Sequence, residues 1–154
     1  MPDTSSEDTL LLVDPDLDFL DWATKHLSAK NLRVLRCDNA ANALKVIEKT
    51  PVSVVVAAME LEPFDGMELL GRIMQQSPQT LVILTAGFPT TGQIIEATQR
   101  GAHFLAELRA SDRRRVALLI EELAKALHIA VSSSAFKQVL VAEHLNFIFF
   151  VKRC

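Results

Sequence analysis

Short apolar runs alternate along this chain with longer segments in which apolar residues recur every three or four positions. Runs of about five apolar residues are typical of strands buried on both faces, and the longer spacing is typical of helices that cover a sheet. The alternation therefore predicts a parallel sheet with helices on both faces. The predicted strands are Thr9–Asp14, Leu32–Arg36, Val52–Ala57, Thr80–Leu84 and His103–Ala106.

A helical segment follows each predicted strand. Gly101 is a typical helix end, because glycine readily adopts the left-handed conformation there. With right-handed crossovers, five strands and five helices predict an α/β, flavodoxin-like, doubly wound five-stranded parallel sheet, (βα)5, with a C-terminal extension. The helices are predicted at Asp18–Lys30, from about Asn39, from Asp65-Gly66 to before Pro78, at Thr91–Arg100 and after a cap at Ser111-Asp112.

The two ends of the chain do not fit this repeat. We divide the sequence into a polar N-terminus at residues 1–8, predicted to be disordered, one domain at residues 9–128, and a C-terminal extension at residues 129–154. The extension has helical spacing and then becomes almost wholly apolar at Phe147–Val151. An exposed apolar segment promotes association, so we expect it to pack on the domain or across a dimer. An altered or truncated reading frame is a third interpretation.

Composition narrows the classes of function. The chain has 154 residues, of which 49% are hydrophobic, and this is enough for one well-packed core. Its net charge of −3 provides no overall attraction to nucleic acid or to an anionic membrane. Cys37 and Cys154 lack the spacing of metal ligands, and the acidic N-terminus is unlike a secretory signal. We expect a reduced, cytoplasmic protein without nucleic-acid or membrane partners.

Candidate chemistry is expected where the parallel strands end, at their carboxyl edge. The first predicted strand ends in the acidic loop Asp14-Pro15-Asp16, which would repel the phosphate of a flavin. Carboxylates at such an edge suit Mg²⁺, although Asp16 or Asp18 is also a typical helix cap. The third predicted strand runs into Ala58, and a methyl group can neither bind a metal nor accept a phosphoryl group.

With these residues in view, the chain resembles the receiver domains of two-component response regulators over residues 9 to 127. In that family an aspartate at the end of the third strand accepts a phosphoryl group, and Ala58 stands at its place. Asp14 matches the first acid of the family's acidic pair, and Pro15 replaces the second, which contacts magnesium. The Phe64–Leu70 segment matches the family's loop and helix start.

The resemblance also assigns switch positions. Thr85 matches a hydroxyl that binds a phosphoryl oxygen, Phe104 matches an aromatic switch residue, and Glu107 stands where the family carries a lysine. Phosphoryl transfer needs the nucleophilic carboxylate and cations to offset charge. The resemblance therefore implies a degenerate pseudo-receiver that is not an enzyme. It has no cofactor, with magnesium at most weak at the residual acidic pocket of Asp14 and Asp16. Permanent mimicry of the phosphorylated state by Glu60 is a less favoured alternative.

If the pocket carries out no phosphoryl transfer, we expect the function to depend on binding at the surface of the domain. The resemblance implies contact with a protein partner, a signalling protein or a second copy in a homodimer, through the fourth helix, fifth strand and fifth helix. Arginine suits bidentate pairing with the carboxylates of an acidic partner, and the alternative interpretation is a solvated basic face. The arginines of this face are Arg100, Arg109, Arg113, Arg114 and Arg115.

A second class of function starts from the same acidic loop. The segment from Leu10 to Asp16 also resembles the first motif of haloacid-dehalogenase-type phosphatases, with Asp14 as nucleophile and Asp16 as general acid/base. That family also requires a lysine and a further acidic pair, and the segment from Gly101 to Asp112 contains no lysine. This phosphatase is the alternative function.

Overall fold

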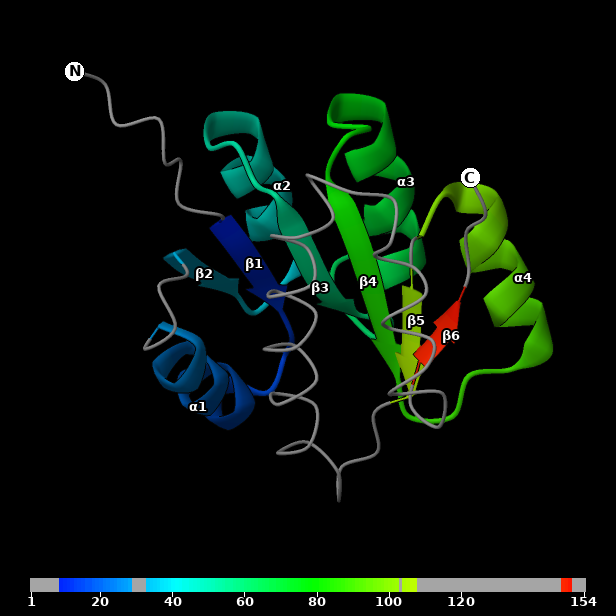
Figure 1. Ribbon diagram of the computed structural model, residues 1–154, viewed down its shortest axis with the longest axis horizontal. Coiled ribbons are helices and arrows are strands. Elements are labelled where there is room, and N and C mark those ends of the chain that lie inside the picture. Colours follow the sequence, from blue (N-terminus) through cyan, green and yellow to red (C-terminus); the bar gives the residue numbers. More distant parts are fainter. Residues whose placement is uncertain (1–8, 29–32, 103, 108–147, 151–154) are drawn as a thin grey trace.

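The computed structural model describes residues 9–28, 33–102, 104–107 and 148–150 of the chain (Figure 1). Within them, strands form one sheet in the order β2-β1-β3-β4-β5-β6. The strands are β1 (Thr9–Val13), β2 (Arg33–Cys37), β3 (Val54–Ala58), β4 (Leu81–Ala86), β5 (Phe104–Glu107) and β6 (Ile148–Phe150), and the helices are α1 (Leu17–Ser28), α2 (Ala40–Lys49), α3 (Gly66–Gln76) and α4 (Thr91–Arg100).

Strands β1 to β4 are parallel, and the strand order reverses at β1. This is the doubly wound arrangement, so the prediction of a flavodoxin-like parallel sheet is confirmed over these four strands. β5 pairs parallel with β4, and β6 pairs antiparallel with β5. The strand β6 was not predicted, because a short apolar run has no period that separates a strand from a helix.

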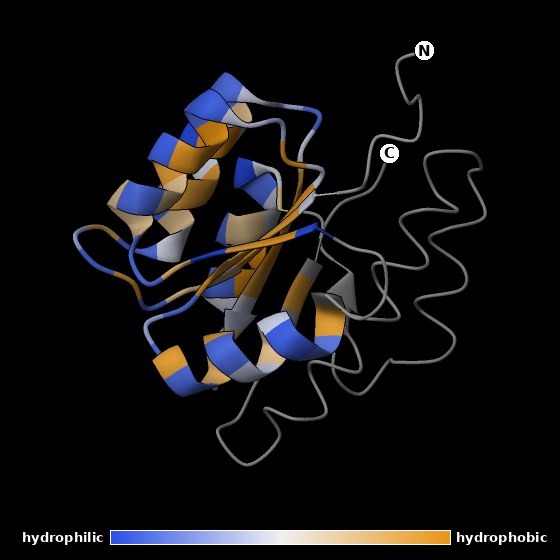
Figure 2. Cartoon of the chain, turned by 90° about the vertical axis from the view of Figure 1, so that its left-hand side faces the viewer, coloured by the Kyte–Doolittle hydropathy of each residue, from blue (hydrophilic) through white to orange (hydrophobic). Residues whose placement is uncertain are grey.

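The two faces of the sheet are covered by different helices (Figure 2). Alternate residues of a strand point to opposite sides, so each strand contributes to two layers of core. The buried residues of α1 belong to one layer, and α2, α3 and α4 pack with the other. In the second layer the strands contribute Leu11, Val13, Cys37, Val55, Ala57, Val82, Leu84 and Leu105.

Two boundaries differ from prediction at the carboxyl edge. Ala58 is the last residue of β3, rather than part of the following loop, because the parallel ladder continues to the pair Ala58 and Thr85. Helix α1 begins at Leu17, one residue earlier than predicted. Its cap is Asp16, whose Oδ1 accepts the Phe19 N–H at 3.1 Å. The sequence left the cap open between Asp16 and Asp18, and this hydrogen bond assigns it to Asp16.

Helix α4 has the bounds that the sequence predicts. Thr90 and Gln93 form a capping box at its start, and Gly101 ends it with a φ of 103°, which is the left-handed conformation. Among its residues only Ala97 is buried. The predicted last helix at Ser111-Asp112, the N-terminus at residues 1–8 and most of the C-terminal extension lie outside the described residues.

In the part of the chain that the structure describes, no helix combines the length and apolar character needed to cross a membrane.

Candidate functional site

A pocket of about 300 Å³ opens at the carboxyl ends of β1, β3 and β4, where the sequence placed the candidate chemistry. Strand-following residues meet there because parallel strands end at the same edge of the sheet. The described residues that line the pocket are Asp14, Pro15, Ala58, Met59, Glu60, Thr85, Ala86, Gly87, Phe88 and Gln93.

The backbone around Ala58 is fixed by hydrogen bonds on both sides. The Met59 N–H donates to the Thr85 carbonyl oxygen at 2.8 Å, and the Gly66 N–H donates to the Met59 carbonyl oxygen at 2.8 Å. A Cβ atom at Gly66 would lie 2.2 Å from the Ala58 carbonyl oxygen, so only glycine permits this approach. The start of α3 therefore packs directly on Ala58.

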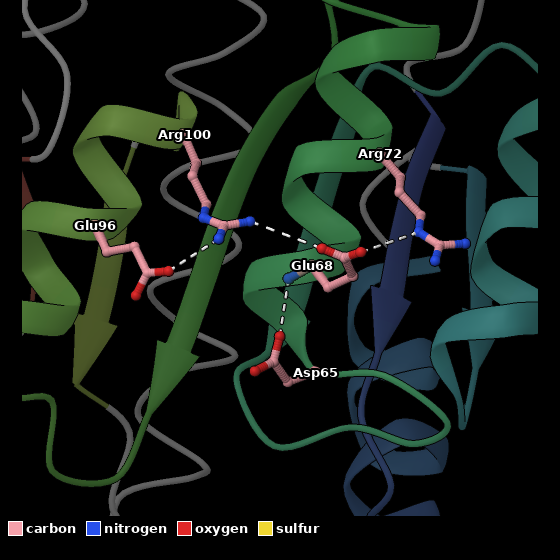
Figure 3. Close-up of polar contacts among 5 residues, drawn as sticks. All are labelled: Asp65, Glu68, Arg72, Glu96 and Arg100. Carbon is pink, nitrogen blue, oxygen red and sulfur yellow. Dashed lines mark hydrogen bonds and ion pairs between the residues drawn. The ribbon is translucent and has the colours of Figure 1, made fainter.

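The Asp65-Gly66 pair explains how α3 begins at that point. The Asp65 Oδ1 accepts the Glu68 N–H at 2.8 Å and caps the helix, as the sequence predicts (Figure 3). Asp65 caps α3, and the adjacent Gly66 allows the helix to approach Ala58 closely. Asp65 is exposed and is not among the residues that line the pocket.

The two aspartates of the first loop have different roles. Asp14 is buried, with 3% of its surface exposed, and lines the pocket. Its Oδ1 accepts the Asp16 N–H at 2.9 Å, and its own N–H donates to the Cys37 carbonyl oxygen at 3.1 Å. Asp16 uses its carboxylate as the cap of α1. Among the described lining residues, the acidic ones are thus Asp14 and Glu60.

These residues do not fit a magnesium ion. A magnesium site needs several oxygen ligands in octahedral geometry, including one or more carboxylates. Pro15 and Ala58 carry no side-chain oxygen, and Glu60 is exposed on the loop after β3. Over the described ranges, no group of three or more His, Cys, Asp or Glu side chains could hold a metal. The described lining therefore lacks the set of oxygen ligands that a magnesium site needs.

Thr85 is the polar residue at the end of β4. It is buried, with 5% of its surface exposed, and it lines the pocket. Its carbonyl oxygen accepts the Met59 N–H at 2.8 Å. The residue that the sequence singled out thus lies at the carboxyl edge, and its role as a switch position stays a prediction.

The other two switch positions lie on β5. In the parallel register Phe104 is opposite Ile83 and Glu107 is opposite Ala86. The backbone of Glu107 therefore lies one residue beyond Ala106, which is the β5 residue opposite Thr85. The side chains of both residues are outside the described part of the structure. Their proposed roles stay predictions.

Of the candidate arginines, the structure describes Arg100. Its Nη2 lies 3.1 Å from the Glu96 Oε1 and its Nη1 lies 3.8 Å from the Glu68 Oε2 on α3 (Figure 3). Arg72 approaches the same Glu68 at 3.6 Å through its Nε. Arg100 is thus engaged by carboxylates of its own domain. Arg109, Arg113, Arg114 and Arg115 lie outside the described residues.

Sequence reasoning did not single out Phe88, which lines the pocket from the loop between β4 and α4. Phe88 is 77% exposed, which is unusual for a large aromatic residue. The available signal was its place three residues after Thr85, between a strand and the next helix cap. A loop residue at a strand's carboxyl end is a reasonable pocket candidate whatever its type.

Comparison with known proteins gives consistent matches. Residues 10–106 match the family model described as the response regulator receiver domain. The chain is 28% identical over 92 residues to the transcriptional regulatory protein GlrR of Escherichia coli K12, covering 60% of this chain and 21% of that protein. It is 27% identical over 94 residues to the chemotaxis protein CheY of Listeria monocytogenes EGD-e, covering 60% of this chain and 75% of that protein.

A solved structure also matches. The signal receiver domain of an HD domain-containing protein from Pseudomonas fluorescens Pf-5 aligns with a TM-score of 0.68 at 26% identity. The alignment covers 86% of this chain and 97% of that one. The transcriptional regulator GlrR is much longer than this match, since the chain aligns with only about a fifth of its length.

Proposed function

The chain belongs to the response regulator receiver domain family, and we propose that it is a pseudo-receiver that accepts no phosphoryl group and acts by binding protein partners. Receiver domains are signalling modules of two-component systems rather than enzymes in general. Loss of the acceptor on a retained fold would leave binding as the function. A fold alone does not fix an activity, so the proposal rests on the site.

The observation that carries the proposal is Ala58 at the end of β3, inside the pocket. Formation of an aspartyl phosphate requires a carboxylate oxygen that attacks phosphorus, and a methyl group has no such atom. Asp14 is the buried carboxylate of the same pocket, and its Oδ1 already accepts the Asp16 N–H. The missing second acid at Pro15 supports the same conclusion, because phosphoryl transfer needs a cation to offset developing charge.

The position of Asp16 argues against the phosphatase alternative. In that alternative Asp16 would exchange a proton with the substrate as general acid/base. Its Oδ1 instead accepts the Phe19 N–H at 3.1 Å as the cap of α1, and Asp16 is not among the described residues that line the pocket. We therefore retain the pseudo-receiver as the proposed function.

We propose a protein partner in a two-component pathway, either a signalling protein or a second copy of the chain, and a cytoplasmic location. A net charge of −3 supports a protein partner over nucleic acid. Arg109, Arg113, Arg114 and Arg115 remain the proposed basic part of the partner face. Arg100 contributes less to that proposal, because Glu96 and Glu68 already contact its guanidinium.

Beryllofluoride binding tests the proposal. Beryllofluoride with magnesium imitates the phosphoryl group on an acceptor aspartate, and Trp22, the only tryptophan, reports on α1 next to the pocket loop. We expect no saturable change of Trp22 fluorescence with magnesium and beryllofluoride together. A saturable, magnesium-dependent change would contradict the proposal. A receiver domain that carries the aspartate, treated in the same way, is the matched control.

A further inference from the structure

The two edges of the sheet differ in charge. β2 forms one edge, and two of its five residues, Arg33 and Arg36, are exposed arginines. Charged side chains on an edge strand oppose pairing with another chain. At the other edge, beyond β5, lies β6, whose sequence Ile-Phe-Phe carries no charge (Figure 1). Pairing with a further strand is therefore favoured on the β5 side of the sheet.

β6 is an addition to the parallel part of the fold. It is antiparallel to β5, whereas β1 to β5 are all parallel. The match to the receiver family model ends at residue 106, so residues 148–150 lie beyond it. The outer edge of β5, which is the edge that faces away from β4, thus accepts an antiparallel strand from outside the repeat.

β5 is held in the domain more firmly than β6. Leu105 is fully buried in the core cluster that also contains Ala97 and Ala102, and β5 pairs with β4 over four residues. In the described part of the chain, β6 is paired with β5 alone, over three residues. A ladder hydrogen bond contributes little net free energy, because it replaces hydrogen bonds to water. Another strand can therefore displace one as short as β6.

A longer strand would also form more pairs than β6 does. The ladder with β6 uses Phe104, Leu105 and Ala106, and β5 continues to Glu107. An antiparallel strand that extends one residue further would pair with Glu107, which is opposite the pocket residue Ala86. Main-chain hydrogen bonds provide the affinity when a peptide adds to a sheet edge. An extended segment of four or more residues therefore has an advantage over β6.

We propose that the outer edge of β5 is a docking site for an extended segment of a protein partner, and that β6 is a built-in competitor for this site. The partner segment is rich in β-branched and aromatic residues, as β6 is, because these residues suit a pleated edge. A second copy of β6 is disfavoured, since the chain's own β6 has a higher effective concentration at β5. The inference rests on the proposed function only in that the chain acts by binding protein partners.

The test uses the full chain labelled with ¹⁵N and titrated with two synthetic peptides. The first, acetyl-Lys-Asn-Phe-Ile-Phe-Phe-Val-Lys-Lys-amide, carries the sequence of residues 146–152 between two added lysines that keep it soluble. The second has proline in place of its isoleucine and its last phenylalanine, which removes N–H donors and disfavours a strand. We expect saturable shifts of the Leu105 amide with the first peptide and none with the second.

A disulfide that holds β6 on β5 locates the binding site. Ala106 and Ile148 are opposite each other in the ladder. Side chains at such positions have Cβ atoms about 4.5–5.5 Å apart, which is near the span of a disulfide. Ala106→Cys with Ile148→Cys is made in a chain that carries Cys37→Ala and Cys154→Ser. Oxidised glutathione should close the disulfide within one chain and weaken peptide binding by about tenfold or more, and the same protein after reduction is the matched control.

Phe149→Pro tests the competition in the opposite direction. Proline removes an N–H from β6 and disfavours its strand conformation, so the edge of β5 should be open in more of the molecules. The first peptide should then bind about threefold tighter or more. Unchanged amide signals of β1 would show that the variant folds. Unchanged or weaker binding by this folded variant would overturn the role of β6 as a competitor.

Four other results would overturn the inference. Equal affinity of the oxidised and reduced forms would place the peptide elsewhere on the chain, and equal binding of the proline peptide would exclude strand pairing. A disulfide that joins two chains, seen as a dimer on a non-reducing gel, would make a second copy the occupant. Failure of the first peptide to bind both the full chain and Phe149→Pro would remove the docking site. All four outcomes are independent of the proposed loss of phosphoryl transfer, which is measured by intact mass after treatment with acetyl phosphate.

Discussion

Ala58 and Thr85 stand opposite each other at the ends of β3 and β4, where they are the last pair of the parallel ladder. The next N–H, that of Met59, donates to the Thr85 carbonyl oxygen at 2.8 Å and holds the two strand ends together. By the resemblance in sequence, these two positions match the acceptor aspartate and the phosphoryl-binding hydroxyl of a receiver domain. Here one of them is a methyl group, and the other is a buried hydroxyl.

A carboxylate restored at residue 58 should destabilise the domain. Ala58→Asp would add a further negative charge to the pocket that already holds the buried Asp14, without a lysine or arginine among the described lining residues. Like charges in one site cost about 1–2 kcal/mol of folding free energy at partial burial. Urea unfolding with and without magnesium chloride measures the effect, and magnesium should recover part of the loss.

Ala58→Asn is the matched control for that variant, because asparagine has the size of aspartate without its charge. The two variants should differ by the electrostatic part alone. Equal stability of both variants in the absence of magnesium would contradict an acidic pocket at this edge.

Gly66 should tolerate no side chain. A Cβ atom there would meet the Ala58 carbonyl oxygen at 2.2 Å, so Gly66→Ala is expected to cost about 3 kcal/mol or more through overpacking. Gly71→Ala on the same helix is the control. Its Cβ would meet the Arg100 Nη1 at an ordinary 3.6 Å, so this change should stabilise α3 by about 0.5–1 kcal/mol. Urea midpoints that move in the same direction for both variants would contradict the close approach.

The ion pairs between α3 and α4 should contribute little at high salt. Glu68 contacts Arg100 and Arg72, and all three side chains are roughly half exposed (Figure 3). A double-mutant cycle of Glu68→Gln and Arg100→Gln is expected to give a coupling of about 0.3–1 kcal/mol that shrinks with added salt. A coupling of several kcal/mol that does not change with salt would contradict the exposure of these three side chains to solvent.

The cap of α1 is assigned to Asp16 rather than Asp18. Asp16→Ala removes the acceptor of the Phe19 N–H and should cost about 1 kcal/mol. Asp18→Ala should cost only about 0.3 kcal/mol, because this exposed residue of the first turn acts through the helix dipole alone. Thermal or urea unfolding distinguishes the two, and the reverse order would assign the cap to Asp18.

The thiol of Cys37 should react slowly, and its ionisation should make the free energy of unfolding depend on pH in the alkaline range. Burial, with a smaller contribution from Asp38, raises the pKa of its thiol above the ordinary value of 9.0. The folded state therefore keeps a proton that the unfolded chain loses. This contribution to stability is complete below the unfolded-state pKa and is lost as pH rises through the folded-state pKa.

Two measurements check the state of Cys37 in a Cys154→Ser variant, where it is the only thiol. Alkylation by iodoacetamide should be slow in the folded chain and fast in urea. Stability should also fall more steeply with alkaline pH than in the same variant carrying Cys37→Ala. Fast alkylation of the folded protein would contradict burial of this thiol.

The sequence predicted the parts of the fold that depend on local patterns. The start and end of α4 follow from Thr90 and Gly101, because capping residues and left-handed glycines act within one turn. The apolar run before Ala58 likewise predicted a buried strand, although the strand extends one residue further than predicted and includes Ala58. Asp65-Gly66 likewise predicted the start of α3.

The parts that were missed depend on contacts between distant segments. Asp14 and Asp16 are alike in sequence, and only the packing of β1 against β2 and β3 places one in the pocket and the other at a cap. The exposure of Phe88 is set by the path of a loop, which no periodicity describes. The pairing of Ile148–Phe150 with β5 joins residues more than forty positions apart and has no local signal.

Intact-mass spectrometry of the full chain after incubation with acetyl phosphate and magnesium tests the central claim most directly. Ala58 offers no acceptor, so we predict an unchanged mass under conditions that phosphorylate a receiver domain carrying the aspartate. Stoichiometric gain of one phosphoryl group, stable enough to map to a carboxylate of the pocket, would contradict the account.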